Sequence, residues 1–197
     1  GRALRVPRER VRARGKPFVT PEIMISERPA SVEDRAVPGH WEGDLIAGAG
    51  NASAIVTMVE RVTRTTLLGH LPGARHDAAS VRDVVVAAPS VLPAHLRRTL
   101  TWDQGSEIAR HAQICAALGT TEIYFCDPHA PWQRPTNENT NGQPRAYFPK
   151  GTDRSVHSDD DIARVEAELT SGHARYSAGT ARGPDGCLLA PPGTERP

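Results

Sequence analysis

The chain has 197 residues, 38% of them hydrophobic, with 17 glycines and 17 prolines, so it can form one domain with a hydrophobic core and much irregular structure. Its net charge of +1 excludes a uniformly basic surface, and its three cysteines, an odd number, suggest no disulfide framework and favour a reducing compartment. We see neither a signal-peptide pattern nor an apolar run long enough to cross a bilayer, and therefore expect a cytoplasmic protein without membrane contact.

The first 37 residues are predicted to form an extended basic arm. Residues 1–16 hold seven Arg or Lys side chains and one acid, a net charge of +6, and prolines interrupt any long helix. A cationic segment of this kind suits a polyanion. We therefore predict DNA contacts from Arg10, Arg12 and Arg14, although a solvated leader would have the same composition.

Regular structure is predicted from residue 41 onward. Three β-like runs, at 41–48, 53–61 and 63–71, predict an antiparallel meander. The later elements are a helix at 76–88, a strand at 97–103, a helix at 106–119, a strand at 121–127 and a helix at 158–169. Three antiparallel strands followed by alternating helices and strands predict an α/β fold, with helices on both faces of a mixed five-stranded sheet.

Local signals set the ends of these helices. Asp77 is a plausible N-cap of the first helix, and Pro89 should end it. Ser106 is the predicted N-cap of the second helix. The inward residues of that helix are predicted to be Ile108, Ala112, Cys115 and Ala116.

The last 28 residues have no sustained periodicity and are rich in glycine and proline. They predict a disordered tail. The expected organisation is therefore an arm at 1–37, a core at 38–169 and a tail at 170–197.

The stretch WEGDLIAG, residues 41–48, puts two acids into a run that otherwise predicts a buried strand. A strand alternates its faces, so Glu42 and Asp44 share one side with Ile46, opposite Trp41. An unpaired charge among apolar neighbours is unfavourable, so Asp44 either lies near a strand end in a polar cleft or has a partner such as a metal ion. Glu42 is interpreted as a sheet-face acid.

Asp44 is one of three acids that stand out by position. Asp103 ends the fourth strand, and Glu138 follows after 34 intervening residues, near the start of a possible helix from Thr136. Like charges ~4 Å apart repel by about 4 kcal/mol at an effective dielectric of ~20, so a cluster of these acids needs protons or cations. Oxygen ligands favour Mg²⁺ or Mn²⁺, and two such ions can promote phosphoryl transfer. Spacing alone leaves open that these are solvated acids at strand ends.

Four long segments resemble the catalytic core of bacterial insertion-sequence transposases of the IS30 family. They are residues 25–46, 95–114, 123–142 and 147–153. The resemblance implies a ribonuclease H-like fold and an Asp-Asp-Glu triad at Asp44, Asp103 and Glu138, with Asp44 bridging two Mg²⁺ or Mn²⁺ ions. It also implies hydrolysis of DNA at the element's ends, strand transfer into target DNA, and a homo-oligomer as the active form.

Side chains around Glu138 are further candidates. Arg134 lies in the loop expected to face DNA, and Asn137, Asn141 and Arg145 are spaced along one face of the predicted helix. These four residues are predicted to bind DNA. An exposed polar helix face is the alternative for the last three.

Several features depart from the family pattern. The chain shows no helix-turn-helix for reading the element's ends. Pro135 stands where a small flexible residue is expected, and Pro144 would fall in the third turn of a helix from Thr136, at a cost of ~3 kcal/mol or with a kink or stop. The sequence thus leaves open a catalytically inactive remnant that only binds DNA non-specifically, or a metal-dependent nuclease without strand transfer.

A zinc site is a weaker alternative. His111, Cys115, Cys126 and His129 have the spacing H-x3-C and C-x2-H. Core cysteines and a loop histidine explain these residues better, because three of the four lie on predicted core elements.

Overall fold

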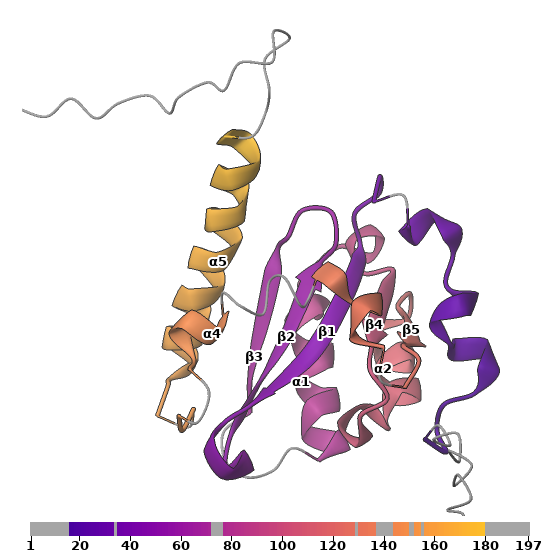
Figure 1. The fold of residues 1–197 in the computed structure, drawn as a ribbon, viewed down its shortest axis with the longest axis horizontal. Helices are drawn as coiled ribbons and strands as arrows, with labels where there is room; N and C mark the ends of the chain where they lie inside the picture. Colours follow the sequence, from indigo (N-terminus) through magenta and orange to yellow (C-terminus); the bar gives the residue numbers. More distant parts are fainter. Residues whose placement is uncertain are drawn as a thin grey trace, which may run out of the picture.

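The computed structural model describes residues 16–33, 35–71, 77–128, 130–136, 144–149, 152–154 and 156–179. Its centre is a mixed five-stranded sheet in the order β3-β2-β1-β4-β5 (Figure 1). The strands are β1 (His40–Ala47), β2 (Ala54–Glu60), β3 (Thr66–Leu71), β4 (Thr99–Trp102) and β5 (Glu122–Phe125). β1, β2 and β3 pair antiparallel, whereas β1, β4 and β5 pair in parallel. The predicted meander and mixed sheet are confirmed, and β1 lies at their junction.

Helices cover both faces of this sheet. On one face, α1 (Ala78–Ser90) and α2 (His111–Leu118) enclose the larger hydrophobic core. On the other face, α5 (Asp159–Gly179) packs a smaller apolar cluster against β2 and β3. Figure 1 shows α1 and α2 behind the sheet and α5 alongside β3. Asp44 on β1 is 25% exposed, so neither layer covers it completely.

The first helix begins as predicted and ends slightly later. The Asp77 side chain accepts hydrogen bonds from the backbone N–H groups of Ala79 and Ser80, which confirms it as the N-cap. Pro89 does not end α1, because the helix runs to Ser90. A proline in the last turn removes only one backbone hydrogen bond, so the helix tolerates it there.

The second helix is shorter than the sequence predicts. Residues Ser106–Ile108 form a separate 3-10 turn, and α2 begins at His111, so Ser106 is not its N-cap. This break shifts the inward face. The buried residues of α2 are Ile114 and Leu118.

Of the four residues predicted to face inward on this helix, only two are buried or half-buried. Ile108 is buried and Cys115 is half-buried. The prediction is wrong for Ala112 and Ala116, which are exposed. A regular helix over the whole segment would have turned these alanines inward, but the interruption before His111 rotates them to the surface.

The described part of the arm is docked rather than extended. Residues 16–33 contain three 3-10 turns, each close to or after a proline. Phe18, Ile23 and Met24 pack against the core under α2. Met24 forms a β-bridge with Phe125 on the outer edge of β5. Proline prevents a long helix here, as predicted, but apolar side chains still fix the chain on the sheet.

The C-terminal helix extends beyond the predicted end of the core. α5 continues through Gly179, so the prediction of disorder is wrong for residues 170–179, and residues 180–197 lie outside the described part. Thr170 explains part of the extension, because its hydroxyl accepts from the N–H of Thr66 and donates to the carbonyl of the same residue. One turn earlier, the Glu166 carboxylate accepts from the N–H of Leu68 at 2.6 Å. Side chains of α5 thus bind the outer edge of β3.

A buried arginine joins the end of β1 to the segment before α5. Arg154 is fully buried, and its guanidinium donates to the carbonyls of Ala47 at 2.7 Å and Phe148 at 3.1 Å. Phe148 follows the short helix α4 (Pro144–Tyr147). Pro144 is the first residue of α4, where the missing N–H costs little.

Candidate active site

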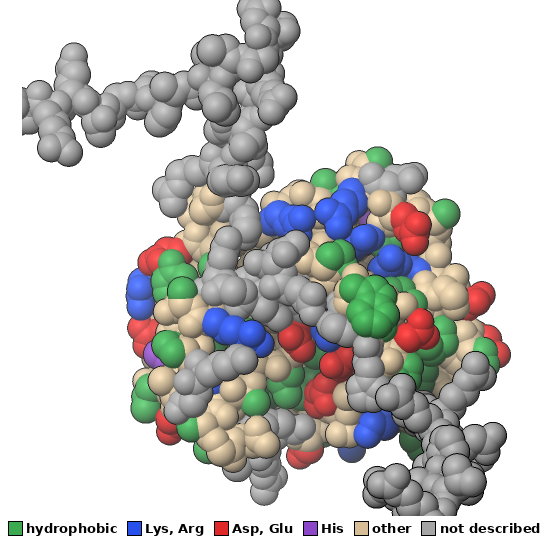
Figure 2. Space-filling view, in the orientation of Figure 1, with side chains coloured by type: hydrophobic (Ala, Val, Ile, Leu, Met, Phe, Trp, Pro, Cys, Tyr) green, Lys and Arg blue, Asp and Glu red, His purple; other side chains and the backbone are tan. Residues whose placement is uncertain are grey.

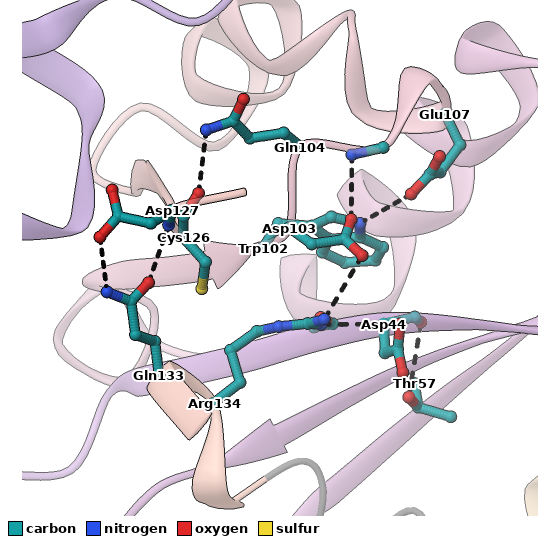
Figure 3. Close-up of polar contacts among 12 residues, drawn as sticks. Asp44, Thr57, Trp102, Asp103, Gln104, Glu107, Cys126, Asp127, Gln133 and Arg134 are labelled. Carbon is teal, nitrogen blue, oxygen red and sulfur yellow. Dashed lines mark hydrogen bonds and ion pairs between the residues drawn. The ribbon is translucent and has the colours of Figure 1, made fainter. Parts of the chain in front are cut away.

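Two of the predicted acids lie just beyond the point where the pairing of β1 with β4 ends. β1 and β4 pair in parallel with Glu42 opposite Thr101. Two residues further along, β1 reaches Asp44 and the chain leaving β4 reaches Asp103, on the face opposite the α1–α2 core (Figure 3). One Asp103 oxygen accepts from the backbone N–H of Gly105 at 3.0 Å. The other lies 3.4 Å from a terminal nitrogen of Arg134, which also contacts Asp44, so the structure brings these two carboxylates to one guanidinium.

The Trp102 ring packs closely against Gly43, the residue before Asp44. This side chain is fully buried, and a Cβ added to Gly43 would lie 2.1 Å from its Cζ3 atom. Only glycine leaves room for the ring at this point in β1. Because Gly43 precedes Asp44 and Trp102 precedes Asp103, one rigid ring sets the spacing of the two strands next to the aspartates.

Arg134 places a guanidinium between the two carboxylates. Its Nη1 lies 3.5 Å from Asp44 Oδ1 and donates to the carbonyl of Gly43 at 2.6 Å. Its Nη2 lies 3.4 Å from Asp103 Oδ2. The Arg134 side chain is 11% exposed, against 25% for Asp44 and 46% for Asp103. Both acids therefore face one shared positive charge, which offsets their mutual repulsion.

Two glutamines hold the loops on either side of Arg134. Gln133 accepts from the backbone N–H of Asp127 and donates to the carboxylate of that residue, both at 2.8 Å (Figure 3). Gln104, next to Asp103, donates to the carbonyl of Cys126 at 3.0 Å. These contacts tie the loop after β5 to itself and to the loop after β4, so the backbone that carries Arg134 has a fixed position.

A further acid beside the site was not identified from the sequence. The Glu107 carboxylate accepts from the indole N–H of Trp102 at 3.2 Å. Burial raises the pKa of Glu107, and the charges of Asp103 and Asp44 add to this rise, against the lowering effect of its hydrogen bonds. Glutamate near the start of a predicted helix is common, so the sequence carried no signal that this side chain turns inward.

The donor set of the site suits a hard divalent cation. Asp44 and Asp103 already share a positively charged partner, and carboxylate oxygens are the ligands that Mg²⁺ and Mn²⁺ prefer. Among the described residues, no group of three His, Cys, Asp or Glu side chains is placed to hold a metal ion. Glu138, the third predicted ligand, lies outside the described residues. The two aspartates therefore fit such an ion as a pair.

Comparison with known proteins identifies the family. Residues 34–131, which span the sheet, both aspartates and the loop after β5, match the family model described as "Integrase core domain". The chain belongs to the integrase core family. This agrees with the ribonuclease H-like fold that the sequence predicted, since strand order and helix placement are those of a mixed sheet covered on both faces.

Curated relatives of this integrase core are bacterial transposases. The transposase for insertion sequence element IS1086 of Cupriavidus metallidurans is 49% identical over 175 residues, covering 88% of this chain and 50% of the relative. Transposase InsI for element IS30A of Escherichia coli is 44% identical over 147 residues, covering 75% and 37%. The transposase for element IS4351 of Bacteroides fragilis is 36% identical, covering 80% and 47%. The chain thus spans half or less of the length of these relatives.

A solved structure shares the fold. A chain in the cryo-electron microscopy structure of the simian T-cell lymphotropic virus intasome in complex with PP2A regulatory subunit B56 gamma matches with a TM-score of 0.52. The identity is 17%, and the match covers 66% of this chain and 48% of that chain. At this identity the likeness concerns the fold alone.

The other predicted DNA-binding residues of the integrase core are only partly described. Arg145 is exposed on α4, whereas Arg134 points at the aspartates rather than outward. Five predicted DNA-binding residues lie outside the described part of the chain: Asn137, Asn141, Arg10, Arg12 and Arg14.

The described start of the arm contacts the loop after β4, which carries Asp103 and Gln104. The backbone N–H of Lys16 donates to the Gln104 side chain at 3.3 Å, and Gln104 follows Asp103. Phe18 anchors this end of the arm, with its ring 5.8 Å from that of Phe125 in an edge-on arrangement. Lys16, the first described residue, therefore lies beside the loop that carries Asp103.

The surface around the site carries both signs of charge. In Figure 2, acidic side chains gather near the middle of the face shown, and Lys and Arg side chains lie around them. Trp132, in the turn just before Arg134, is 70% exposed. Within the described part of the chain, no helix combines the length and apolar composition needed to span a membrane.

A buried ion pair involves Glu42, two residues before Asp44 on β1. Glu42, fully buried, accepts from Nε of Arg61 at 3.0 Å, and Arg61 also donates to the carbonyl of Val32. Arg28 donates to the Thr101 hydroxyl at 3.2 Å on the same face. This layer attaches the arm to the sheet, and it confirms that Glu42 is a sheet-face acid.

The described residues give no support to the zinc alternative. The ring of His111 packs edge-on against Phe125 at 5.2 Å. Burial raises the pKa of the Cys115 thiol, and it raises that of Cys126 to about 11. Thiols with raised pKa values are poor metal ligands near neutral pH. His129 lies outside the described residues.

Proposed function

We propose that this chain is the catalytic core of a DNA transposase. In this proposal it hydrolyses a phosphodiester at the end of a mobile element and joins the freed 3′-hydroxyl to target DNA, working as a homo-oligomer. The observation that carries the proposal is the pair Asp44 and Asp103, which face the Arg134 guanidinium where the parallel pairing of β1 and β4 ends in an integrase core. The curated transposases similar to this chain support the choice of reaction.

Asp44, Asp103 and Glu138 are the residues proposed to hold two Mg²⁺ or Mn²⁺ ions. Bound divalent ions activate the attacking water or hydroxyl and stabilise the leaving oxygen in phosphoryl transfer. The chain's own contribution is position. Trp102 sets the separation of the two aspartates from beneath, and the Gly105 N–H orients one Asp103 oxygen. Preorganised ligands of this kind avoid rearrangement during the reaction.

The DNA would be held by the basic arm and by the loop around Arg134. The arm meets the site at Lys16, and the exposed indole of Trp132 lies in the same loop as Arg134. Phosphate contacts from Lys and Arg orient a duplex without reading its sequence. We therefore expect DNA binding by this chain to weaken steeply as salt rises.

A branched DNA provides the sharpest assay, because the ends that a full transposase would recognise are unknown. The substrate is a labelled branched duplex that mimics the product of strand transfer, and the full 197-residue chain is incubated with it in Mn²⁺. By microscopic reversibility, a site that catalyses strand transfer also resolves this branch into two products. Supercoiled plasmid in a parallel reaction reports hydrolysis alone.

Asp103→Asn tests the site, and Asp83→Asn is the matched control on α1, where the side chain pairs with Arg82. We expect Asp103→Asn to lower branch resolution by about a thousandfold, since metal-bound charge contributes several kcal/mol and each 1.36 kcal/mol is tenfold. Asp83→Asn should match the parent. Equal activity in all three proteins would refute the proposed site, and DNA binding with no activity in the parent would favour the inactive remnant.

A further inference from the structure

Arg134 occupies the position that a metal ion would need. Its two terminal nitrogens lie 3.5 Å and 3.4 Å from one oxygen of Asp44 and one of Asp103. Figure 3 shows the guanidinium reaching the space between the two carboxylates. An ion that coordinates both oxygens at the short distances of Mg²⁺ or Mn²⁺ would therefore meet the positive charge of Arg134 beside it.

The contacts of Arg134 with the two acids are weaker than its contact with the backbone. The bond from Nη1 to the Gly43 carbonyl is 2.6 Å, whereas both carboxylate contacts are near the long end of the hydrogen-bonding range. In addition, Arg134 Nε is buried and has no hydrogen-bond partner among the described residues. The guanidinium is thus held mainly by Gly43 and by its loop, and it can leave the acids without losing its strongest contact.

We propose that Arg134 is a built-in counter-ion of the metal-free site, which divalent ions must displace from Asp44 and Asp103. Arg134 is then a positioning residue: it keeps the two carboxylates together before metal binds and lowers their affinity for metal. The inference rests on the proposed function only in taking the two aspartates as metal ligands. It assigns to Arg134 a role toward the acids, in addition to any contact with DNA.

Mn²⁺ binding without DNA tests this role directly. The electron paramagnetic resonance signal of free Mn²⁺ is titrated with the full-length parent, Arg134→Met, Arg134→Gln and Arg134→Lys. Arg110→Met is the matched control, because it removes an exposed charge that contacts Gln113 rather than either aspartate. Thermal unfolding with and without Mn²⁺ is measured on the same proteins.

Both neutral variants should bind Mn²⁺ about tenfold more tightly than the parent, a change that corresponds to about 1.4 kcal/mol. Arg134→Lys and Arg110→Met should stay within about twofold of the parent. In metal-free buffer the neutral variants should melt at a lower temperature than the parent, and they should gain more from Mn²⁺. Arg134→Gln can still donate to Gly43, so it keeps the test valid if Arg134→Met does not fold.

Unchanged or weaker Mn²⁺ binding in both neutral variants would overturn the inference. Such a result is separable from failure of the proposed function. In that second case, Mn²⁺ would bind more tightly to the neutral variants, but the parent would show no branch resolution and no effect of Asp103→Asn.

Discussion

Glu42 and Asp44 lie two residues apart on the same face of β1, and each contacts a different arginine. The two ion pairs differ in burial and in length. The Glu42 carboxylate is fully buried and contacts Arg61 at 3.0 Å, and the side chain of Arg61 is 7% exposed. Asp44 is 25% exposed and contacts Arg134 at 3.5 Å. The first pair is closed to water, whereas the second opens toward the surface.

This difference separates an ion pair that maintains the fold from one that can exchange its cation. Removing one partner of a buried pair leaves an uncompensated charge in a medium of low dielectric, so both partners must stay. The pairs of Arg134 are longer and partly hydrated, and their energy is correspondingly smaller. Three substitutions test this contrast, two on β1 and one at Glu107 beside the site, beginning with the buried pair.

Glu42→Gln should have the largest effect on stability. The variant leaves Arg61 buried without its counter-charge, and the expected loss is about 3–5 kcal/mol in the free energy of unfolding. Urea denaturation followed by far-ultraviolet circular dichroism measures this loss. Asp44→Asn, on the same strand face, is the matched control and should cost less than about 1 kcal/mol. Similar losses for the two variants would erase the distinction between the pairs.

Gly43→Ala should have an intermediate effect, because it lies between the two acids and disturbs the opposite face. The new Cβ would lie 2.1 Å from the Trp102 ring, so the strands must separate, at a cost of about 1–3 kcal/mol. Branch resolution should fall as well, since the ring sets the spacing of the aspartates. Gly172→Ala is the control: its Cβ would meet no atom within 4 Å, and it should be neutral or slightly stabilising. A fully stable and active Gly43→Ala protein would contradict the role given to Trp102.

Glu107→Gln should have the smallest effect, visible only as a dependence on pH. Burial raises the pKa of Glu107 above 4.5, so the folded protein holds this proton more tightly than the unfolded chain does. The parent therefore loses stability as pH rises from below 4.5 through the raised pKa, whereas the Gln variant has no such proton to lose.

The measurement is the melting temperature of the Glu107→Gln variant minus that of the parent, from pH 4 to pH 7. This difference should increase with pH. Gln can still accept the hydrogen bond from Trp102, so the comparison isolates the charge. A difference that does not change with pH would show that the carboxyl ionises normally in the folded protein.

Local signals in the sequence were sufficient for the sheet and for the strand face of Asp44, whereas only the family resemblance grouped Asp44 with Asp103. The period-two alternation around Asp44 predicted which face each side chain would occupy, and the order of strands predicted a mixed sheet. Asp103 was predicted to end the short strand at 97–103, and it follows β4 directly. These features depend on neighbours in the chain, which a sequence displays directly.

Features that depend on distant contacts could not be read in this way. Arg134 was predicted to face DNA, but it turns toward two acids that lie 31 and 90 residues earlier in the chain. The docking of Phe18 on Phe125 is a second example, since nothing near Phe18 in the sequence indicates its partner. The role of Glu138 stays a prediction.

Both edge strands of the sheet, β3 and β5, have contacts along their outer edges. Glu166 and Thr170 bind backbone N–H groups of β3, and Met24 bridges to β5. An open strand border recruits strands from other molecules, which leads to aggregation or to assembly by strand addition. In the homo-oligomer on DNA proposed above, we therefore expect copies of this chain to meet through helices and loops, with each sheet kept to a single molecule.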